Sequence, residues 1–163
     1  GKTLEDGEFQ GKAKVFDSEK AAMAAIRDGS VIAGDVIVVR NVGPVGAPGM
    51  PEMVHLTLQL QGRGLGKDVA LITDGRFSGV SHGILVGHIC PEGAKGGPIG
   101  AVRDGDTIVI NPKTRRLDLD ITPDELAARM ARLGTPELSD LPEGSVLNKY
   151  RRLVSSARHG CVL

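Results

Sequence analysis

The segment Val69–Gly79 reads VALITDGRFSG, and its character changes abruptly after Ile72. The first four residues are apolar, as expected for a short strand buried inside a sheet. Polar residues and glycines follow at once, and they include Ser78. In open α/β folds, functional groups stand just past the carboxyl ends of such strands. The segment therefore predicts an α/β fold and makes the turn after this strand a candidate site.

Further strands are predicted on both sides of this segment. Asp35–Arg40 is β-branched and almost continuously apolar, which is typical of a strand covered on both faces. Residues 117–121 alternate between apolar and acidic side chains, as in a half-exposed strand. Residues 101–103 and 107–110 flank an Asp-Gly-Asp turn, and this pattern predicts a β-hairpin. Two further strands are expected at 12–16 and 84–89.

Four helices are predicted from their end signals. Ser18 is a candidate N-cap of a helix that Gly29 ends. Thr122 is a candidate N-cap of a helix that runs to about Leu133. The other two are expected from Pro51 to Gly62, with Glu52 in the first turn, and from 146 to 157.

Strands and helices mix without strict alternation, so we predict one compact domain over residues 9–163. Its mixed sheets are expected to lie in layers or to form a barrel-like arrangement, with the helices outside. Residues 1–8 are mostly polar, and the first predicted strand follows them closely. We interpret them as an arm or a truncated linker, and the chain as a piece of a longer protein.

Composition excludes several classes of protein. Twenty acidic residues balance twenty basic ones, so no net field favours nucleic acid or a membrane surface. No apolar run approaches the ~20 residues of a transmembrane helix. The two cysteines, Cys90 and Cys161, make no disulfide framework, and a cytoplasmic protein is expected. The 23 glycines follow no strict period and indicate many tight turns.

The loop 43–52 holds three glycines and three prolines and ends in Glu52. Two interpretations of Glu52 are open. By composition alone the favoured one is a surface acid that interacts with a helix dipole. The alternative is a ligand of Mg²⁺, which takes oxygen ligands and usually only one or two carboxylates.

Ser78 also has two interpretations. The segment around it is not a G-x-S-x-G nucleophile elbow, because residue 76 is Arg. His82 is near in sequence, but no partner supports a catalytic triad. From the residues alone, a turn serine bonded to its own backbone is favoured over a functional serine.

The remaining histidines and cysteines carry weaker signals. His55 falls on the helix after Glu52, and His88, inside an apolar strand, is interpreted as a structural core residue. Cys90 is expected to pack as a small hydrophobe, since one sulfur cannot hold an iron–sulfur cluster. The basic group Lys149, Arg151, Arg152 and Arg158 is interpreted as the solvated side of the last helix.

Taken together and in order, the motifs resemble the dihydroxy-acid dehydratase and 6-phosphogluconate dehydratase family, in its carboxy-terminal domain. The resemblance covers about Phe9 to Gly160. It rests on VFDSE, GDVIV, GP…PGMPEM, LITDGRFSG, GH…PE…GGPI, DGD and the tail VL-KY-LVSSA. Each motif alone is weak, but their conjunction in this order is specific.

The resemblance implies a swivelling β/β/α domain and the dehydration of a 2,3-dihydroxy acid to a 2-keto acid in branched-chain amino-acid synthesis. It implies an iron–sulfur cluster that acts as a Lewis acid on the 3-hydroxyl and a Mg²⁺ that holds the carboxylate and the 2-hydroxyl. By motif, Ser78 matches the serine base and Glu52 matches a glutamate that binds Mg²⁺. A homodimer is implied by the family as well.

The family's cluster cysteines, and its other metal ligands including a modified lysine, belong to an amino-terminal half. The isolated chain is therefore predicted to be inactive without that amino-terminal domain. Small departures from the family occur at Val80-Ser81, at Cys90 and at Gly93, and they bear on substrate positioning. The alternatives are a sugar-acid dehydratase of the same family, a separate small subunit that docks on a catalytic partner, and a non-catalytic binding module.

Overall fold

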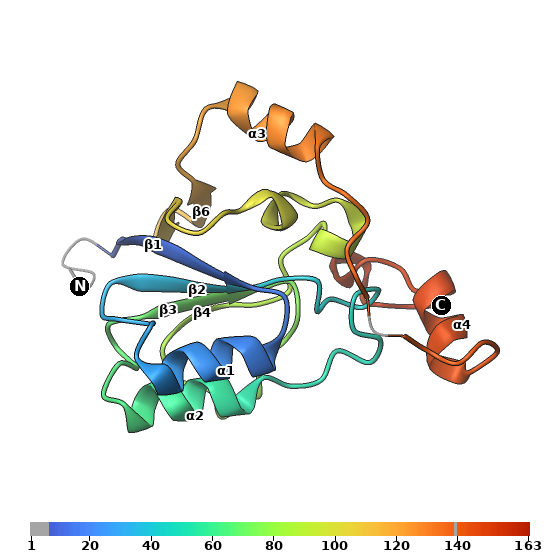
Figure 1. Ribbon diagram of the computed structural model, residues 1–163, viewed down its shortest axis with the longest axis horizontal. Helices are drawn as coiled ribbons and strands as arrows, with labels where there is room; N and C mark the ends of the chain where they lie inside the picture. The colour runs from blue at the N-terminus through green and yellow to red at the C-terminus, as the bar shows by residue number, and fades with distance from the viewer. Residues whose placement is uncertain (1–6, 139) are drawn as a thin grey trace.

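One mixed six-stranded sheet forms the centre of the molecule (Figure 1). The computed structural model describes residues 7–138 and 140–163. The strand order is β4-β3-β2-β1-β5-β6, and the first four strands in this order pair in parallel, whereas β5 is antiparallel to β1 and to β6. The strands are β1 Phe9–Phe16, β2 Asp35–Val39, β3 Ala70–Thr73, β4 Ile84–Val86, β5 Thr107–Asn111 and β6 Arg116–Leu119.

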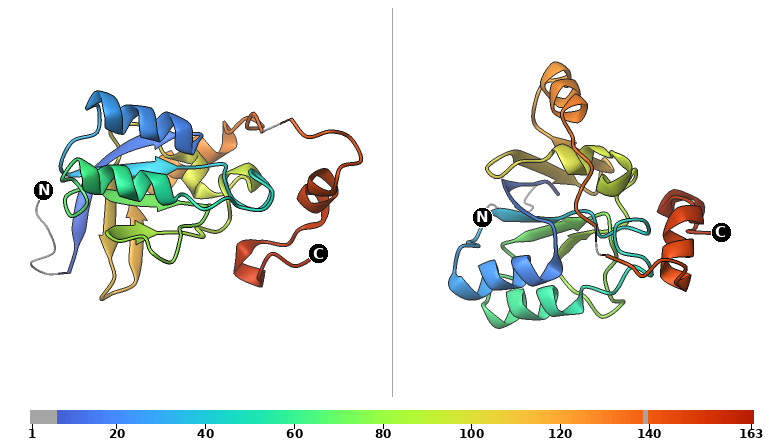
Figure 2. Two further views of the ribbon diagram at one scale, coloured as in Figure 1. Left: turned by 90° about the horizontal axis from the view of Figure 1, so that it is seen from below. Right: turned by 45° about the vertical axis from the view of Figure 1, so that its right-hand side comes forward.

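The sheet curls, so that β5 and β6 run across the direction of β2 and β3 (Figure 2). Four helices surround it: α1 Glu19–Asp28, α2 Val54–Gly62, α3 Pro123–Ala131 and α4 Val146–Leu153. Helices α1 and α2 lie side by side on one face, and α3 lies beyond the other (Figure 1). The prediction of an α/β fold with a mixed sheet and outer helices is confirmed, although one curled sheet replaces separate layers.

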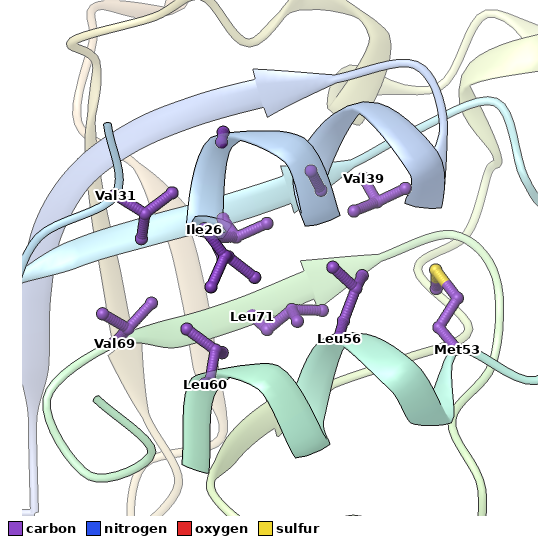
Figure 3. Packing of buried hydrophobic residues seen from close by; sticks show 11 residues of the cluster. Ile26, Val31, Val39, Met53, Leu56, Leu60, Val69 and Leu71 are labelled. Carbon is purple, nitrogen blue, oxygen red and sulfur yellow. The ribbon is translucent and has the colours of Figure 1, made fainter. Parts of the chain in front are cut away.

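Strand β2 is the centre of the core, because all five of its residues are buried. Ile37 and Val39 face α1 and α2, where Ile26 and Leu56 pack against them (Figure 3). The alternate residues of β2 contribute to a second cluster on the opposite face, with Phe9, Ile72 and Ile108. Each such side chain contributes about 1.5–3 kcal/mol on burial. The predicted strand covered on both faces is confirmed.

The predicted helix ends at Ser18, Gly29 and Thr122 are also confirmed. The Ser18 side chain accepts a hydrogen bond from the Ala21 amide at 3.2 Å. Gly29 ends α1 with a φ of 85°, in the left-handed region that favours glycine. The Thr122 side chain accepts from the Glu125 amide at 3.2 Å, so α3 begins as predicted.

The predicted start of α2 near Pro51 is wrong. The helix begins at Val54, and Glu52 stands before it in an isolated β-bridge with Arg76. The Met53 amide donates to the Arg76 carbonyl at 3.2 Å, so this backbone is held in an extended form by a neighbouring loop. Glu52 is therefore no helix-dipole acid in the first turn.

The predicted hairpin around the Asp104-Gly105-Asp106 turn is wrong as well. The turn docks on β1, since the Gly105 amide donates to the Ala13 carbonyl at 2.9 Å. Strand β5 then pairs with β1 and with β6, and residues 98–101 form a short 3₁₀ turn. The final helix and the strand β4 are shorter than predicted, ending at Leu153 and Val86. Most of the predicted arm, residues 1–6, lies outside the described residues.

Candidate functional site

Two loops meet at the carboxyl edge of the parallel strands. The loop after β2 ends in Glu52, and the loop after β3 holds Arg76 and Ser78. They are joined by the Glu52–Arg76 bridge and by the bond between the Met53 amide and the Arg76 carbonyl. The structure therefore brings the segments of both predicted site residues together, although they lie 26 positions apart in sequence.

Glu52 is held by an ion pair with Arg76. Arg76 Nη1 donates to Glu52 Oε1 at 2.9 Å, and Arg76 Nε donates to the Met50 carbonyl. The two side chains are 42% and 43% exposed, so the pair adds little to folding stability. Its effect is geometric, because one guanidinium spans residues 50 and 52 and leaves Glu52 Oε2 free for another partner.

Ser78 lies two residues beyond Arg76 and is half-buried. Its Oγ accepts a long hydrogen bond of 3.5 Å from the Val80 amide, and its carbonyl accepts from the Ser81 amide at 3.0 Å. This is the geometry of a turn serine. The hydroxyl acts as an acceptor in that contact, and its proton is left for another partner.

A buried carboxylate, Asp74, fixes the start of the first loop. Its side chain is fully buried and accepts from the amides of Asn41 and Val42, each at 3.0 Å, and of Gly93 at 2.8 Å. Burial raises the pKa of Asp74, and these backbone hydrogen bonds only partly oppose the effect. The sequence predicted a polar turn here but no role for this residue.

Glu92 fixes the middle of the same loop. It is 5% exposed and accepts from the amides of Val45 at 3.1 Å and Gly46 at 2.9 Å. Burial is the main cause that raises the pKa of Glu92, and the nearby Asp74 charge adds to it. Gly46 is required, because a Cβ there would lie 2.1 Å from the Asn41 carbonyl oxygen.

Arg151 of α4 completes the set of side chains that hold this loop. Its Nε donates to the Val45 carbonyl at 3.0 Å, and its Nη2 donates to the Gly46 carbonyl at 3.4 Å. The interpretation of Arg151 as part of a solvated face is wrong, whereas Lys149, Arg152 and Arg158 are exposed as predicted. No local pattern could reveal a contact across 106 positions.

The histidines lie apart from a common centre. His55, His82 and His88 are exposed, so the prediction of a core position for His88 is wrong. The reason is that β4 ends at Val86 and the chain turns, with a positive φ at His88. Cys90 is half-buried and donates to the His88 carbonyl at 3.0 Å. Cys161 lies 3.9 Å, sulfur to sulfur, from Met50, and burial raises the pKa of its thiol.

Where the two loops meet, the described residues supply the accessible carboxylate of Glu52 rather than a full set of metal ligands. Within 7–138 and 140–163, no three His, Cys, Asp or Glu side chains cluster as a metal site. Glu52 fits one position of a Mg²⁺ shell. Two cysteines in the whole sequence are too few for an iron–sulfur cluster, which takes about four ligands. A nearby cavity of about 740 Å³ is lined by Asn41, Gly93 and residues 133–137, and it borders neither Glu52 nor Ser78.

A comparison with known protein families assigns the chain to a family of dehydratase domains. Residues 1–161 match the family described as Dihydroxy-acid/6-phosphogluconate dehydratase C-terminal, and the chain is a member of it. This confirms the resemblance seen in the motifs. None of the helices in the described part of the chain has the length and apolar character needed to cross a membrane.

Three relatives show which dehydratases it is similar to. The chain is 54% identical over 154 residues to the dihydroxy-acid dehydratase of Methylococcus capsulatus and 53% identical over 154 residues to that of Aeropyrum pernix. In both cases 94% of this chain and 27% of the relative are covered. It is 51% identical over 157 residues to the mitochondrial dihydroxy-acid dehydratase of Saccharomyces cerevisiae, with 95% and 26% covered. The chain thus spans about a quarter of the length of these relatives.

Proposed function

We propose that the chain acts as the carboxy-terminal domain of a dihydroxy-acid dehydratase, which converts 2,3-dihydroxy-3-methylbutanoate-type acids to 2-keto acids. The observation that carries the proposal is the Glu52–Arg76 bridge, because it sets a carboxylate and Ser78 on adjoining loops. The names of the relatives support a dihydroxy acid over a sugar acid as substrate.

Glu52 is the proposed ligand of Mg²⁺ in this domain. It is accessible, and Arg76 engages only its Oε1. Mg²⁺ prefers about six oxygen ligands and keeps several waters, so one carboxylate from this domain is a reasonable share. The remaining ligands are assigned to an amino-terminal domain, which is also the proposed holder of an iron–sulfur cluster. When bound, the Mg²⁺ supplies positive charge that stabilises a developing oxyanion.

Ser78 is the proposed base that removes the proton at C2 of the substrate. A serine hydroxyl is too weak a base at neutral pH, so its own proton must first be released to solvent, and a strongly positive environment favours that release by stabilising the alkoxide. The Arg76 guanidinium, two positions away, is ion-paired with Glu52 and adds little net charge, so the positive charge would have to come from the metal ion that Glu52 is proposed to bind. The half-buried position of Ser78 leaves it reachable from solvent and therefore by a small acid.

The dehydration removes the C2 proton and the C3 hydroxyl as water, and the resulting enol tautomerises to the ketone. The residues of this chain that are assigned a role, Glu52 and Ser78, bear on the first of these events. The swivelling-domain arrangement, a homodimer and a cytoplasmic location are proposed from the family resemblance, and the curled sheet with outer helices is compatible with the first of these.

A chimera tests the proposal directly. Residues 1–163 replace the matching quarter of the Methylococcus capsulatus relative, and keto-acid formation is followed anaerobically while Mg²⁺ is titrated. Glu52→Gln should raise the Mg²⁺ concentration for half-maximal rate by at least about tenfold, since it removes one charged ligand. The exposed Glu143→Gln is the matched control and should leave that concentration unchanged. Equal Mg²⁺ dependence of the two variants would refute the role of Glu52.

A further inference from the structure

Apolar side chains gather on the surface of the carboxy-terminal segment. Eight large apolar residues of the described chain are exposed, and five of them lie between 146 and 163. They are Val146, Leu147, Leu153, Val162 and Leu163. Single exposed apolar residues are ordinary, but a local group of them marks an interaction site.

Helix α4 is not packed into the core of its own domain. None of its residues is buried, and it stands apart from the sheet and from α1 and α2 in both figures of the whole chain (Figures 1 and 2). Val146, Lys149 and Leu153 follow the three- and four-residue spacing of one helix face. This face therefore has no partner within the described part of the chain.

The helix is nevertheless held in a defined place. Arg151 binds the carbonyls of Val45 and Gly46, and Cys161 contacts Met50. The tail folds back on the segment, because the Ser155 amide donates to the Val162 carbonyl at 2.8 Å. The apolar group is thus presented beside the loop that leads to Glu52.

The site next to this helix lacks groups that the proposed reaction needs. Glu52 is the one carboxylate offered to a metal at the meeting of the two loops, and no cluster of three ligands occurs in the described residues. Whatever brings the other ligands must approach this edge of the sheet. Helix α4 borders the same loop through Arg151, so it lies on the side of the domain that such a body would approach.

We propose that the face of α4 formed by Val146, Leu153 and the adjoining tail is the docking surface for the larger amino-terminal portion that the relatives carry. The relatives have about three quarters of their length outside the match. Lys149 lies on this face between Val146 and Leu153, and Arg152 and Arg158 are also exposed in this segment, so the partner surface is expected to combine apolar with acidic side chains. The inference rests on the proposed function, since that function requires the second domain.

Arg151 gives docking a consequence for the site. The same helix that receives the partner holds the carbonyls of residues 45 and 46. Docking on α4 therefore acts on the helix whose Arg151 already holds the loop that ends in Glu52.

The test measures binding and does not require turnover. The 163-residue chain is titrated with the separately expressed amino-terminal portion of the Methylococcus capsulatus relative. We expect a complex, weakened at least tenfold by Leu153→Asp and by Val146→Asp. The control is Ile32→Asp, because Ile32 is 62% exposed and precedes β2, at the opposite edge of the sheet from loop 43–52. Circular dichroism checks that α4 is retained.

Three results would overturn the docking surface. They are the absence of any complex with the wild-type chain, an equal loss of binding in Ile32→Asp and Leu153→Asp, and self-association of the wild-type chain that Leu153→Asp abolishes. The last would show a second copy on this face instead. A complex that depends on Leu153 but forms no keto acid would instead contradict the proposed reaction and leave the docking surface standing.

Discussion

Arg76 and Glu52 are joined twice, by a β-bridge between their backbones and by an ion pair between their side chains. Backbone pairing fixes the distance between the two loops, and the guanidinium orients the carboxylate at 2.9 Å. Since Ser78 follows Arg76 by two positions, the geometry of the proposed metal ligand and of the proposed base depends on the same residue.

Replacement of Arg76 should damage the site more than the fold. Arg76→Ala removes the contacts to Met50 and Glu52, and we expect about a tenfold fall in kcat of the chimera. The free energy of unfolding should change by less than about 1 kcal/mol, as is usual for an exposed ion pair. Arg76→Lys keeps the charge but cannot contact both Met50 and Glu52, so its kcat should lie between those of the wild type and Arg76→Ala. A loss of stability that matches the loss of activity would contradict a positioning role.

Asp74 should be essential for stability. All three of its partners are backbone donors, so the amide of Asp74→Asn would point an N–H at another N–H in a buried site. We expect a loss of about 2–4 kcal/mol in the free energy of unfolding, measured by urea denaturation. The exposed Asp120→Asn is the control and should change it by less than about 0.5 kcal/mol.

Two glycine substitutions should have opposite effects. Gly46→Ala would place a Cβ 2.1 Å from a backbone oxygen, so the loop must shift and stability should fall by about 2 kcal/mol or more. Gly62 lies at the end of α2 with no atom near its Cβ position, so Gly62→Ala should stabilise by up to about 1 kcal/mol. Thermal unfolding of the two variants measures the difference, and a stable Gly46→Ala would contradict the tight approach.

The ionisation of Asp106 should make the free energy of unfolding depend on pH in the acidic range. Burial acts to raise its pKa, but hydrogen bonds from Arg129 and from the Arg103 amide outweigh burial and lower the pKa below its usual value. A lowered folded-state pKa means that the stabilisation is present above the unfolded pKa of about 3.9 and is lost as pH falls through the folded pKa.

The comparison of wild type with Asp106→Asn isolates this effect. At pH 7 the variant should be less stable by about 1–3 kcal/mol, since it loses a charged partner of Arg129. The difference should shrink as the pH is lowered below about 4. A difference that is constant from pH 7 to pH 2.5 would show that ionisation of Asp106 does not contribute.

Local signals in the sequence predicted the parts of the fold that depend on neighbours in the chain. Ser18 and Gly29 bound α1 because capping and a left-handed turn involve only adjacent residues. The two-sided burial of Asp35–Val39 followed from its continuous apolar run. The prediction of a hairpin at the Asp104-Gly105-Asp106 turn is wrong because the partner of this turn, Ala13, lies about ninety positions away in the sequence.

In the candidate site, too, features that depend on sequence neighbours could be predicted, and contacts between distant residues could not. The motifs placed Glu52 and Ser78 at loop ends, but the bridge that moves Glu52 out of α2 depends on Arg76. The side chains of Asp74 and Glu92 are buried and accept hydrogen bonds from backbone amides of a different loop. No repeating pattern in the sequence predicts such contacts. The sequence alone cannot show that a carboxylate is fully buried, because the backbone amides that donate to it come from other loops whose positions only the structure gives.

The central claim is that Ser78 is the base of a dehydratase, and one comparison tests it most directly. In the chimera, kcat for keto-acid formation from 2,3-dihydroxyisovalerate is measured for Ser78→Ala and for Ser81→Ala, a hydroxyl lost three positions further along. We expect kcat to fall by a factor of about 10²–10⁴ for Ser78→Ala, typical of a lost general base, and to change by less than about twofold for Ser81→Ala. A folded Ser78→Ala chimera that turns over at the wild-type rate would contradict it.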